Sequence, residues 1–374
     1  MRLLVAINNN IPEWRSTTAP SGEMPRLPLP YAFGGAFLKR GHQLSAINVS
    51  DTVPSGELYP FSSVHPVRNL TSALKGVDVA ALWGGLGVSA ILRQGMITPM
   101  QRRVVLCSYV WALNSLPTMK GKQLGLATQL AGQFAKAVVV MTEEQADLAR
   151  RSLFLRVPVI KFRCGIDTAY YRIPSSICDV PETHRKQVGL LLTKPYVIMP
   201  GDELRCDNDV LELVQHSDIR LVRISQYANS DKQNRLRAEV KRRGIQDRFF
   251  VFEKISYAFM RFLLQNASAY AGLVDSSWQP AGWTVVCEAL SSGLPVVVYD
   301  GLVTRELAWT GVDPSICRSV PMGNIPAFQD ALQYFVSQSR REDNLEKARS
   351  FSQDFLDFKQ TADDFVVAME KVVD

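Results

Sequence analysis

The sequence lacks the features that mark an exported or membrane-spanning chain. Its opening residues, MRLLVAINNN, have neither the long apolar core nor the small-residue cleavage site of a signal peptide. No uninterrupted apolar run reaches the roughly eighteen residues that a membrane-spanning helix needs. We therefore expect a cytoplasmic protein that neither crosses a membrane nor leaves the cell by the usual route.

Signatures of metal, disulfide and cofactor sites are missing as well. The six cysteines are scattered without a C-x-x-C pair, which predicts reduced and mostly buried thiols. The four histidines, at positions 42, 65, 184 and 216, show no metal-ligand spacing with one another or with a cysteine pair. No motif marks a lysine for pyridoxal phosphate. The sequence therefore predicts no bound metal and no resident cofactor.

The length and composition are those of a globular protein with more than one domain. At 374 residues the chain is longer than a single hydrophobic core usually grows, so two domains are expected. The hydrophobic fraction of 47% and the charged fraction of 21% lie near globular averages. Two domains imply a cleft between them.

Charge is unevenly distributed along the chain. Residues 1 to 170 hold 18 Lys and Arg against 9 Asp and Glu, a net charge of +9, whereas the remainder holds 24 against 27, a net −3. The basic first half predicts contact with something anionic, such as a phospholipid surface, a phosphorylated acceptor or nucleic acid. Ordinary solvated basic faces explain the same numbers, and both interpretations stay open.

Short β-branched runs alternate with amphipathic segments, which is typical of βα units that build a parallel sheet. Strands are predicted in the first half at residues 2–7, 43–49, 79–83, 103–107, 137–141 and 159–162. In the second half they are predicted at 196–199, 220–224, 249–252, 269–274 and 295–298. Thr142 and Gln145 form a capping-box pattern that starts a helix. The fold class is therefore α/β, with two doubly wound domains.

The alternating pattern lapses between the two halves, in a stretch with two prolines and no sustained period. This predicts a first domain over residues 1–172, a linker over 173–194 and a second domain over 195–355. Residues 356–374 are helical by periodicity and no strand follows them. We expect this last helix to pack back on the first domain.

Ligands of open parallel sheets bind at the carboxyl ends of the strands, so the loops there are the candidate sites. One loop ends in Gly34 and Gly35, which let a phosphate approach a helix start, although paired glycines also serve turns and packing. A second loop contains Gly201 and Arg205, and the Arg205 guanidinium could bind a diphosphate through paired hydrogen bonds. The alternative for this second loop is a solvated turn in which Asp207 caps a helix.

The third loop, residues 276–301 with the sequence SSWQPAGWTVVCEALSSGLPVVVYDG, carries the strongest signal. A glycine-containing turn opens a helix whose free amides suit an anion, and Glu288 on that helix could hold the vicinal hydroxyls of a ribose. The alternative is a buried structural glutamate paired with an arginine.

This third loop resembles the donor-binding signature of the retaining, glycogen-synthase-like glycosyltransferases of the group 1, or family 4, type. The segment GWTVVCEALSSGLPV is similar to the family's E-A-x-x-x-G-x-P-V pattern, and Gly165-Ile166-Asp167 resembles its G-I-D-x-x-x-F turn. The resemblance covers nearly the whole chain in weak form. It implies the GT-B architecture, in which two Rossmann-like domains face each other across a cleft.

The resemblance also implies roles for individual residues. The first domain would bind the acceptor and the second a nucleotide sugar such as a UDP-sugar. Glu288 would hold the ribose, and Arg205 and the amides near Gly282, Trp283 and Thr284 would hold the diphosphate. A further set of residues would line the same donor, namely Gly34 and Gly35 from the facing domain, Gly201, and Lys254 in the VFEKI segment beside the base.

The chain departs from the family pattern at three places. The family's first glutamate, which touches the donor sugar, falls at Gln279 or Pro280, where there is no carboxylate. Its Arg-x-x-x-x-Lys pair is here DELRCDND, so the lysine is missing and the arginine is displaced. Ser108 and Tyr109 occupy the loop where a histidine often stands, and we place them at the acceptor.

By this resemblance an acceptor hydroxyl attacks the anomeric carbon while the nucleoside diphosphate leaves, with retention and without a metal. Arg205 and helix-terminal amides would stabilise the leaving phosphate, so Arg205 and Glu288 are the catalytic candidates. Family precedent favours a saccharide or lipid-linked acceptor. The basic first half, and the basic and apolar segment 119–136, would allow peripheral contact with an anionic membrane, although a core-facing helix explains that segment as well.

Three other activities stay open. A DNA-modifying glycosyltransferase that acts on a hydroxylated base would suit the basic pI of about 9.0, but no basic stripe interleaved with aromatics is visible. A sugar-nucleotide-binding pseudoenzyme would fit the missing first glutamate. An epimerase or a phosphorylase with the same architecture is the third.

Overall fold

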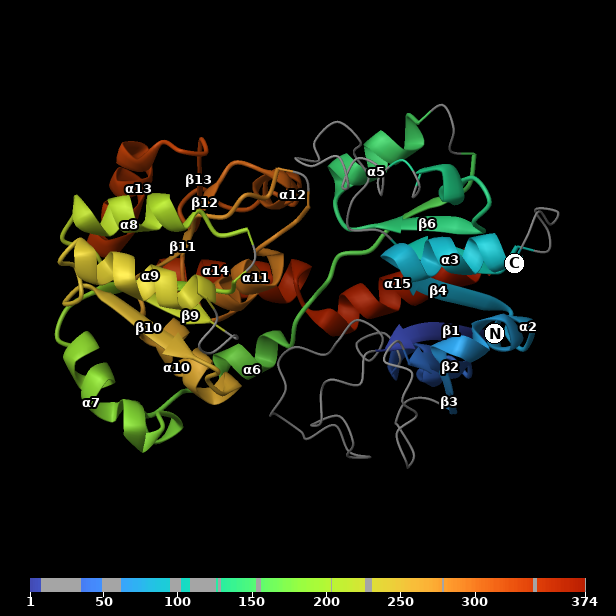
Figure 1. Cartoon of the computed structure of the whole chain (residues 1–374), viewed down its shortest axis with the longest axis horizontal. Coiled ribbons are helices and arrows are strands. Elements are labelled where there is room, and N and C mark those ends of the chain that lie inside the picture. The colour runs from blue at the N-terminus through green and yellow to red at the C-terminus, as the bar shows by residue number, and fades with distance from the viewer. Residues whose placement is uncertain are drawn as a thin grey trace. The chain divides into compact units, whose positions relative to one another are not determined.

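A computed structural model of the chain describes residues 1–7, 35–48, 62–94, 102–107, 126, 129–152, 156–202, 204–225, 231–277, 279–338 and 342–373. The chain divides into two compact units (Figure 1). Unit 1 comprises Met1–Gly165 together with Phe358–Asp374, and unit 2 comprises Ile166–Asp357. Each unit is built on its own parallel sheet with helices, so the fold class is α/β, as predicted.

Unit 1 contains a sheet of seven strands in the order β3-β2-β1-β4-β5-β6-β7. Its strands are β1 Arg2–Ile7, β2 Gln43–Asn48, β3 Ser63–Pro66, β4 Val79–Trp83, β5 Val104–Cys107, β6 Ala137–Val140 and β7 Val159–Lys161. All neighbouring strands are parallel. The order reverses direction between β1 and β4, which makes the sheet doubly wound.

Helices cover both faces of this first sheet. They are η2 Val67–Asn69, α2 Leu70–Lys75, α3 Gly84–Gln94, α5 Glu143–Arg150 and α15 Phe358–Val373. Leu3 and Val5 of β1 point to a core that includes Phe365 of α15, whereas Leu4 points to a core with α2, α3 and α5. The side-chain period of two along a strand puts successive residues on opposite faces, so β1 feeds both cores.

The C-terminal helix α15 belongs to unit 1 although the chain reaches it from unit 2. Its Ala362, Phe365 and Met369 pack into the core of the first sheet, at a helical spacing. Its Glu370 accepts from Arg40 Nη1 at 2.7 Å. These contacts fix the end of the chain on the first sheet.

Unit 2 contains a sheet of six strands in the order β10-β9-β8-β11-β12-β13, all parallel. Its strands are β8 Tyr196–Pro200, β9 Arg220–Ser225, β10 Phe249–Glu253, β11 Ala269–Gly272, β12 Val296–Tyr299 and β13 Cys317–Val320. Strands β8, β11 and β12 are buried at every residue, as expected of parallel strands covered on both faces.

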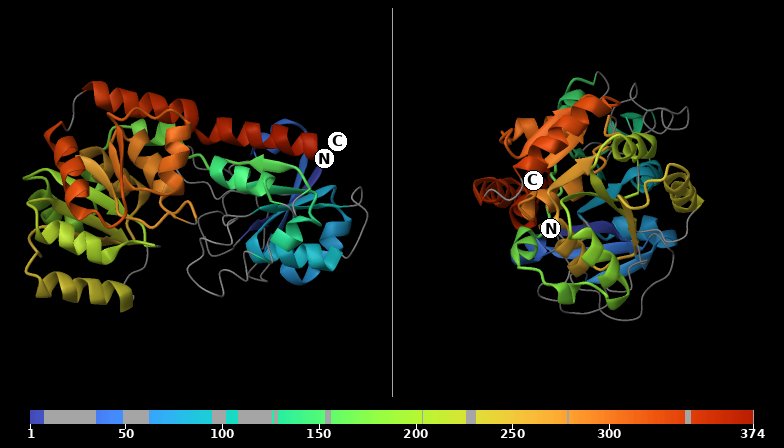
Figure 2. Two further views of the ribbon diagram at one scale, coloured as in Figure 1. Left: turned by 90° about the horizontal axis from the view of Figure 1, so that it is seen from above. Right: turned by 90° about the vertical axis from the view of Figure 1, so that its left-hand side faces the viewer.

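The helices of unit 2 lie on both faces of this sheet (Figure 2). They are α6 Thr168–Arg172, η4 Ile177–Asp179, α7 Glu182–Leu191, α8 Asp207–Gln215, α9 Asp231–Arg242, α10 Tyr257–Asn266, α11 Trp283–Ser291, α12 Leu302–Trp309, α13 Ile325–Ser337 and α14 Glu342–Phe355. Helices α8, α9 and α13 share one core with the sheet. Helix α11 packs against β11 and β12 and also contacts α6 and α14.

The segment 173–194, predicted as a linker, holds η4 and α7 and lies within unit 2. Ser176 caps η4 and Asp179 completes that cap. Val188 and Leu191 of α7 are buried, but Leu190 is 54% exposed and most of the other residues are polar, which explains why the periodicity of α7 is weak in the sequence.

Candidate functional site

The loop after β8 lies at the topological switch point of unit 2, where the strand order reverses between β8 and β11. Open α/β sheets bind their ligands at such points. The loop is fixed to the chain that follows β11. Cys206 N donates to Leu273 O at 3.0 Å, and Arg205 forms an antiparallel bridge with Val274. The candidate site is therefore built on backbone hydrogen bonds between two loops.

Gly201 and Arg205 are brought together within this loop. The Gly201 backbone has φ +98°, a region that disfavours any side chain, and a Cβ there would lie 2.1 Å from Arg205 Nη2. Arg205 is buried at 9% exposure and donates from Nε to Pro200 O at 3.2 Å. Only glycine at position 201 leaves room for the guanidinium over the backbone.

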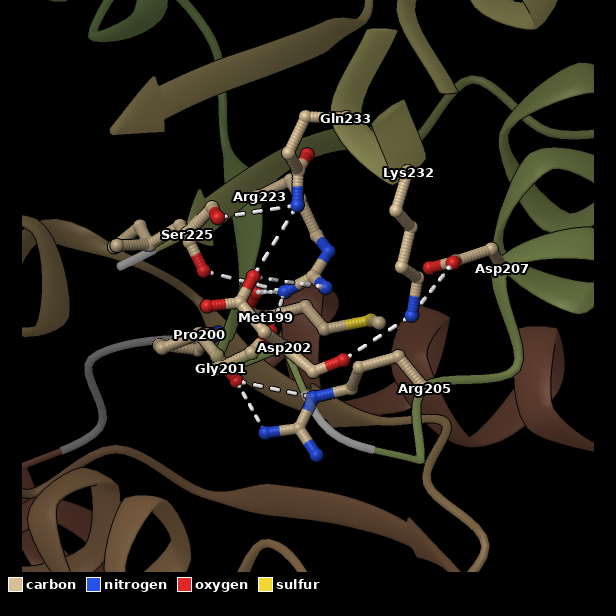
Figure 3. Close-up of polar contacts among 11 residues, drawn as sticks. Met199, Pro200, Gly201, Asp202, Arg205, Asp207, Arg223, Ser225, Lys232 and Gln233 are labelled. Atoms are coloured by element: carbon tan, nitrogen blue, oxygen red, sulfur yellow. Dashed lines mark hydrogen bonds and ion pairs between the residues drawn. The ribbon is translucent and has the colours of Figure 1, made fainter. Parts of the chain in front are cut away.

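Two further cations hold the same loop (Figure 3). Arg223 of β9 donates to Met199 O at 3.3 Å and also to Gly201 O. Lys232 of α9 donates to Asp202 O at 3.1 Å. Together with the bonds from Arg205 to Pro200 O, these contacts give every carbonyl from residue 199 to residue 202 a cationic donor.

Arg223 is fully buried, at 0% exposure. Burial, and then the neighbouring Arg205, lower the pKa of Arg223 to about 10, against the attraction of Asp207 and Asp202. Its Nη2 lies 3.8 Å from Asp202 Oδ1, a carboxylate oxygen that accepts from Gln233 Nε2 at 3.2 Å. Nε and Nη2 of Arg223 have no hydrogen-bond acceptor among the described residues.

Helix α11 begins beside this loop. Its N-cap is Gly282, with φ +85°, which has no side chain to cap the helix, and Trp283 N at the start of the helix donates to Pro280 O at 3.2 Å. A Cβ on Gly282 would lie 3.6 Å from Val274, the residue that bridges to Arg205. Trp283 is buried and Thr284 is half-buried. The start of α11 therefore lies close to the loop that carries Arg205, and an anion site at this helix start stays a prediction.

Glu288 has a different position from the one expected of a residue at the rim. Its side chain is at 0% exposure, and Oε1 accepts from the Tyr171 hydroxyl at 2.7 Å. Tyr171 stands at the aromatic position of the G-I-D-x-x-x-F turn, whose Asp167 caps α6. The two motif segments are therefore joined through a buried hydrogen bond. This position favours a structural glutamate, and the ribose contact of Glu288 stays a prediction.

The remaining predicted residues are placed as follows. Lys254 is exposed after β10, with φ +48°, and its N donates to Ser225 O at 2.9 Å, so it lies at the same edge of the sheet. Gln279 is half-buried in the turn before α11, where its carbonyl accepts from Ala281 N. Gly35 is half-buried in a helical segment of unit 1. Gly34, Ser108 and Tyr109 lie outside the described residues.

The sequence contains a signal for the buried arginine that lies outside the family motifs. A strand covered on both faces of a parallel sheet is expected to be apolar, yet β9 reads RLVRIS, with Arg223 near its carboxyl end.

Across the described ranges no group of three His, Cys, Asp or Glu residues could hold a metal ion. No helix among the residues placed by the structure is long and apolar enough to cross a membrane.

No protein-family model matches the sequence, and no curated protein matches it. Solved structures do match, over nearly the whole chain. Sucrose-phosphate synthase from Thermosynechococcus elongatus superposes with a TM-score of 0.72 at 14% identity, covering 99% of this chain and 98% of the other. HepE from Anabaena in complex with UDP gives a TM-score of 0.69 at 13% identity, covering 99% and 100%.

The α,α-trehalose 6-phosphate synthase of Burkholderia multivorans also matches, with a TM-score of 0.69 at 13% identity, covering 99% of this chain and 96% of the other. These proteins are GT-B glycosyltransferases. At such low identity the likeness defines the fold, and it confirms the predicted GT-B architecture of two Rossmann-like units.

Proposed function

We propose that the chain is a glycosyltransferase that moves a sugar from a nucleoside diphosphate donor to a hydroxyl acceptor. The observation that carries the proposal is the loop after β8 in a GT-B fold. There Arg205 lies over the Gly201 backbone, in a loop close to the start of α11, whose N-cap Gly282 has no side chain. The structural neighbour HepE was solved with UDP and with UDP-glucose, which favours a nucleotide sugar as the donor class.

In the proposed reaction the acceptor oxygen bonds to the anomeric carbon while the bond from that carbon to the diphosphate breaks. The acceptor proton passes to an oxygen of the leaving phosphate. The developing charge lies on the diphosphate, so the groups that lower the barrier are cations and amide donors fixed in advance. Arg205 and the first turn of α11 provide both. The mechanism we propose is retaining and metal-independent.

A saccharide or a lipid-linked saccharide is the acceptor we propose. Three apolar residues of the basic and apolar segment are exposed, Leu126 and Leu130 at 48% and Phe134 at 40%. Leu126 and Leu130 lie four residues apart in helical backbone and share one face, and Phe134 follows in a turn, where its ring centre lies 5.9 Å from Arg102 Cζ. This face supports peripheral contact with an anionic lipid surface. We expect co-sedimentation with anionic vesicles that falls with salt, and a Leu130→Asp variant that stays in solution.

The donor proposal is tested by replacing Arg205. Arg205→Met keeps most of the side-chain volume and removes the charge, so the dissociation constant for UDP should rise by about 10-fold to 100-fold. Arg220→Met is the matched control, because Arg220 is a partly buried arginine at the amino end of β9, the opposite edge of the same sheet. Equal effects of the two variants on affinity would contradict a donor contact for Arg205.

The enzyme proposal needs a turnover measurement in addition to binding. The wild-type chain, incubated with UDP-glucose and other nucleotide sugars but no acceptor, should slowly release nucleoside diphosphate. An enzyme that needs no metal retains this activity in a chelator. Tight binding without any release, with or without saccharide acceptors, would favour the non-catalytic alternative that the missing carboxylate at Gln279 and Pro280 raises.

A further inference from the structure

The backbone of residues 199–202 has an unusual set of partners. Four consecutive carbonyl oxygens, those of Met199, Pro200, Gly201 and Asp202, each accept from a cationic side chain (Figure 3). The cations come from three elements, namely β9, the loop itself and α9. A carbonyl oxygen carries partial negative charge and repels an anion. Because all four carbonyl oxygens accept from cations, they do not face an anionic ligand that binds at the loop.

The two carboxylates of the cluster are neutralised in the same way. Asp202 Oδ1 accepts from Gln233 Nε2 and lies 3.8 Å from Arg223 Nη2. Asp207 Oδ2 lies 3.1 Å from Lys232 Nζ. Each of these two carboxylates therefore lies within 4 Å of a cation. Arg223 is fully buried in this cluster, with two nitrogens that have no acceptor among the described residues. A buried guanidinium whose N–H donors are not all satisfied favours an anion nearby.

The cations of this cluster differ in solvent exposure, and therefore in whether a ligand can contact them. The Arg223 side chain is at 0% exposure and that of Lys232 is at 46%. An ammonium carries three N–H donors. Within the part of the chain that the structure describes, Lys232 directs two of them to Asp202 O and Asp207 Oδ2. Lys232 is therefore the cation that can add a phosphate oxygen to its partners without leaving the loop.

We propose that Lys232 contacts the diphosphate of the donor and that Arg223 is a positioning residue, which holds the carbonyls of residues 199 and 201 away from it. This inference rests on the proposed function. In the related glycosyltransferases an Arg-x-x-x-x-Lys pair after the glycine would bind the diphosphate. Here we assign that role in part to a lysine of α9. Asp202 and Asp207, which stand in that DELRCDND segment, keep these cations in place until the donor binds.

The test compares a nucleoside diphosphate with the nucleoside that lacks the phosphates. UDP and uridine, GDP and guanosine, and ADP and adenosine are titrated as pairs into the full chain. Lys232→Met should weaken binding of the preferred diphosphate by about 10-fold, the loss expected for one charge-assisted hydrogen bond, and leave the nucleoside unchanged. Lys241→Met, an exposed lysine near the other end of α9, should change neither.

Arg223→Lys tests the positioning role, because it keeps the charge but loses the fork that reaches two carbonyls. We expect weaker diphosphate binding with unchanged nucleoside binding, whereas a purely structural role would lower both affinities together with the melting temperature. If the wild-type chain binds no diphosphate, the proposed function fails. If it binds one and Lys232→Met binds it equally well, the assignment of Lys232 is overturned while the proposed function stands.

Discussion

Replacing Gly201 with alanine perturbs the candidate site at a single atom. The new Cβ would lie 2.1 Å from Arg205 Nη2, on a backbone with φ +98°. An L-residue in a left-handed conformation costs about 1–2 kcal/mol. The guanidinium must also move, and the hydrogen bonds that it donates to Pro200 O are lost in part. We expect the free energy of unfolding of unit 2 to fall by about 2–4 kcal/mol.

Gly244→Ala separates backbone strain from the clash. Gly244 has φ +68°, and a Cβ added there would meet no atom within 4 Å, so its replacement should cost only the strain. Urea denaturation of both variants measures the difference, and UDP titration should show weaker binding for Gly201→Ala alone. In an Arg205→Ala background the Gly201→Ala cost should drop to that of Gly244→Ala. Equal costs at positions 201 and 244 in the native background would refute the proposed contact.

Two other predictions concern groups away from this loop. Tyr171→Phe leaves the buried Glu288 carboxylate without the hydroxyl donor and should destabilise the chain by about 1–3 kcal/mol in urea denaturation; an unchanged midpoint would show that the hydrogen bond contributes nothing. Burial and nearby aspartates raise the pKa of Cys206 to about 11, so its reactive thiolate should form only as the pH approaches that value. Alkylation at pH 8, followed by peptide mass spectrometry, should label the exposed Cys178 first, and equal rates at both thiols would contradict this.

Strands with strong apolar character could be predicted from the sequence, whereas two short polar strands at sheet edges could not. Strands β1 and β4 have the predicted limits, and the capping box of Thr142 and Gln145 forms at α5. Strands β3 and β13, with the sequences SVHP and CRSV, went unpredicted. Each lies at one edge of its sheet, where fewer residues need be apolar, and its four residues carry no readable pattern. The other two edge strands, β7 and β10, have the more apolar sequences VIK and FFVFE, and both were predicted.

The backbone conformation of the glycines in the candidate site could be predicted from the sequence. The exposure and the partners of its polar residues could not. Gly201 and Gly282 both have positive φ, which a glycine at a strand–helix turn signals. The exposure of Glu288 could not be foreseen, because a carboxylate in a helix looks the same whether it faces a ligand or a tyrosine from another helix. The partnership of Arg223 and Lys232 with residues 199–202 depends on the pairing of β8 with β9 and on the position of α9. These contacts join residues that are far apart in the sequence, so no local sequence pattern indicates them.

The proposed donor site is tested most directly by calorimetric titration of the native chain with UDP, GDP and ADP in the presence of a chelator. We predict that one of the three binds at one site per chain and that its nucleoside binds more weakly, because the cations around residues 199–205 hold the phosphates. Absence of binding by all three nucleotides, from a chain that is folded by circular dichroism, would contradict the assignment of a nucleoside diphosphate site.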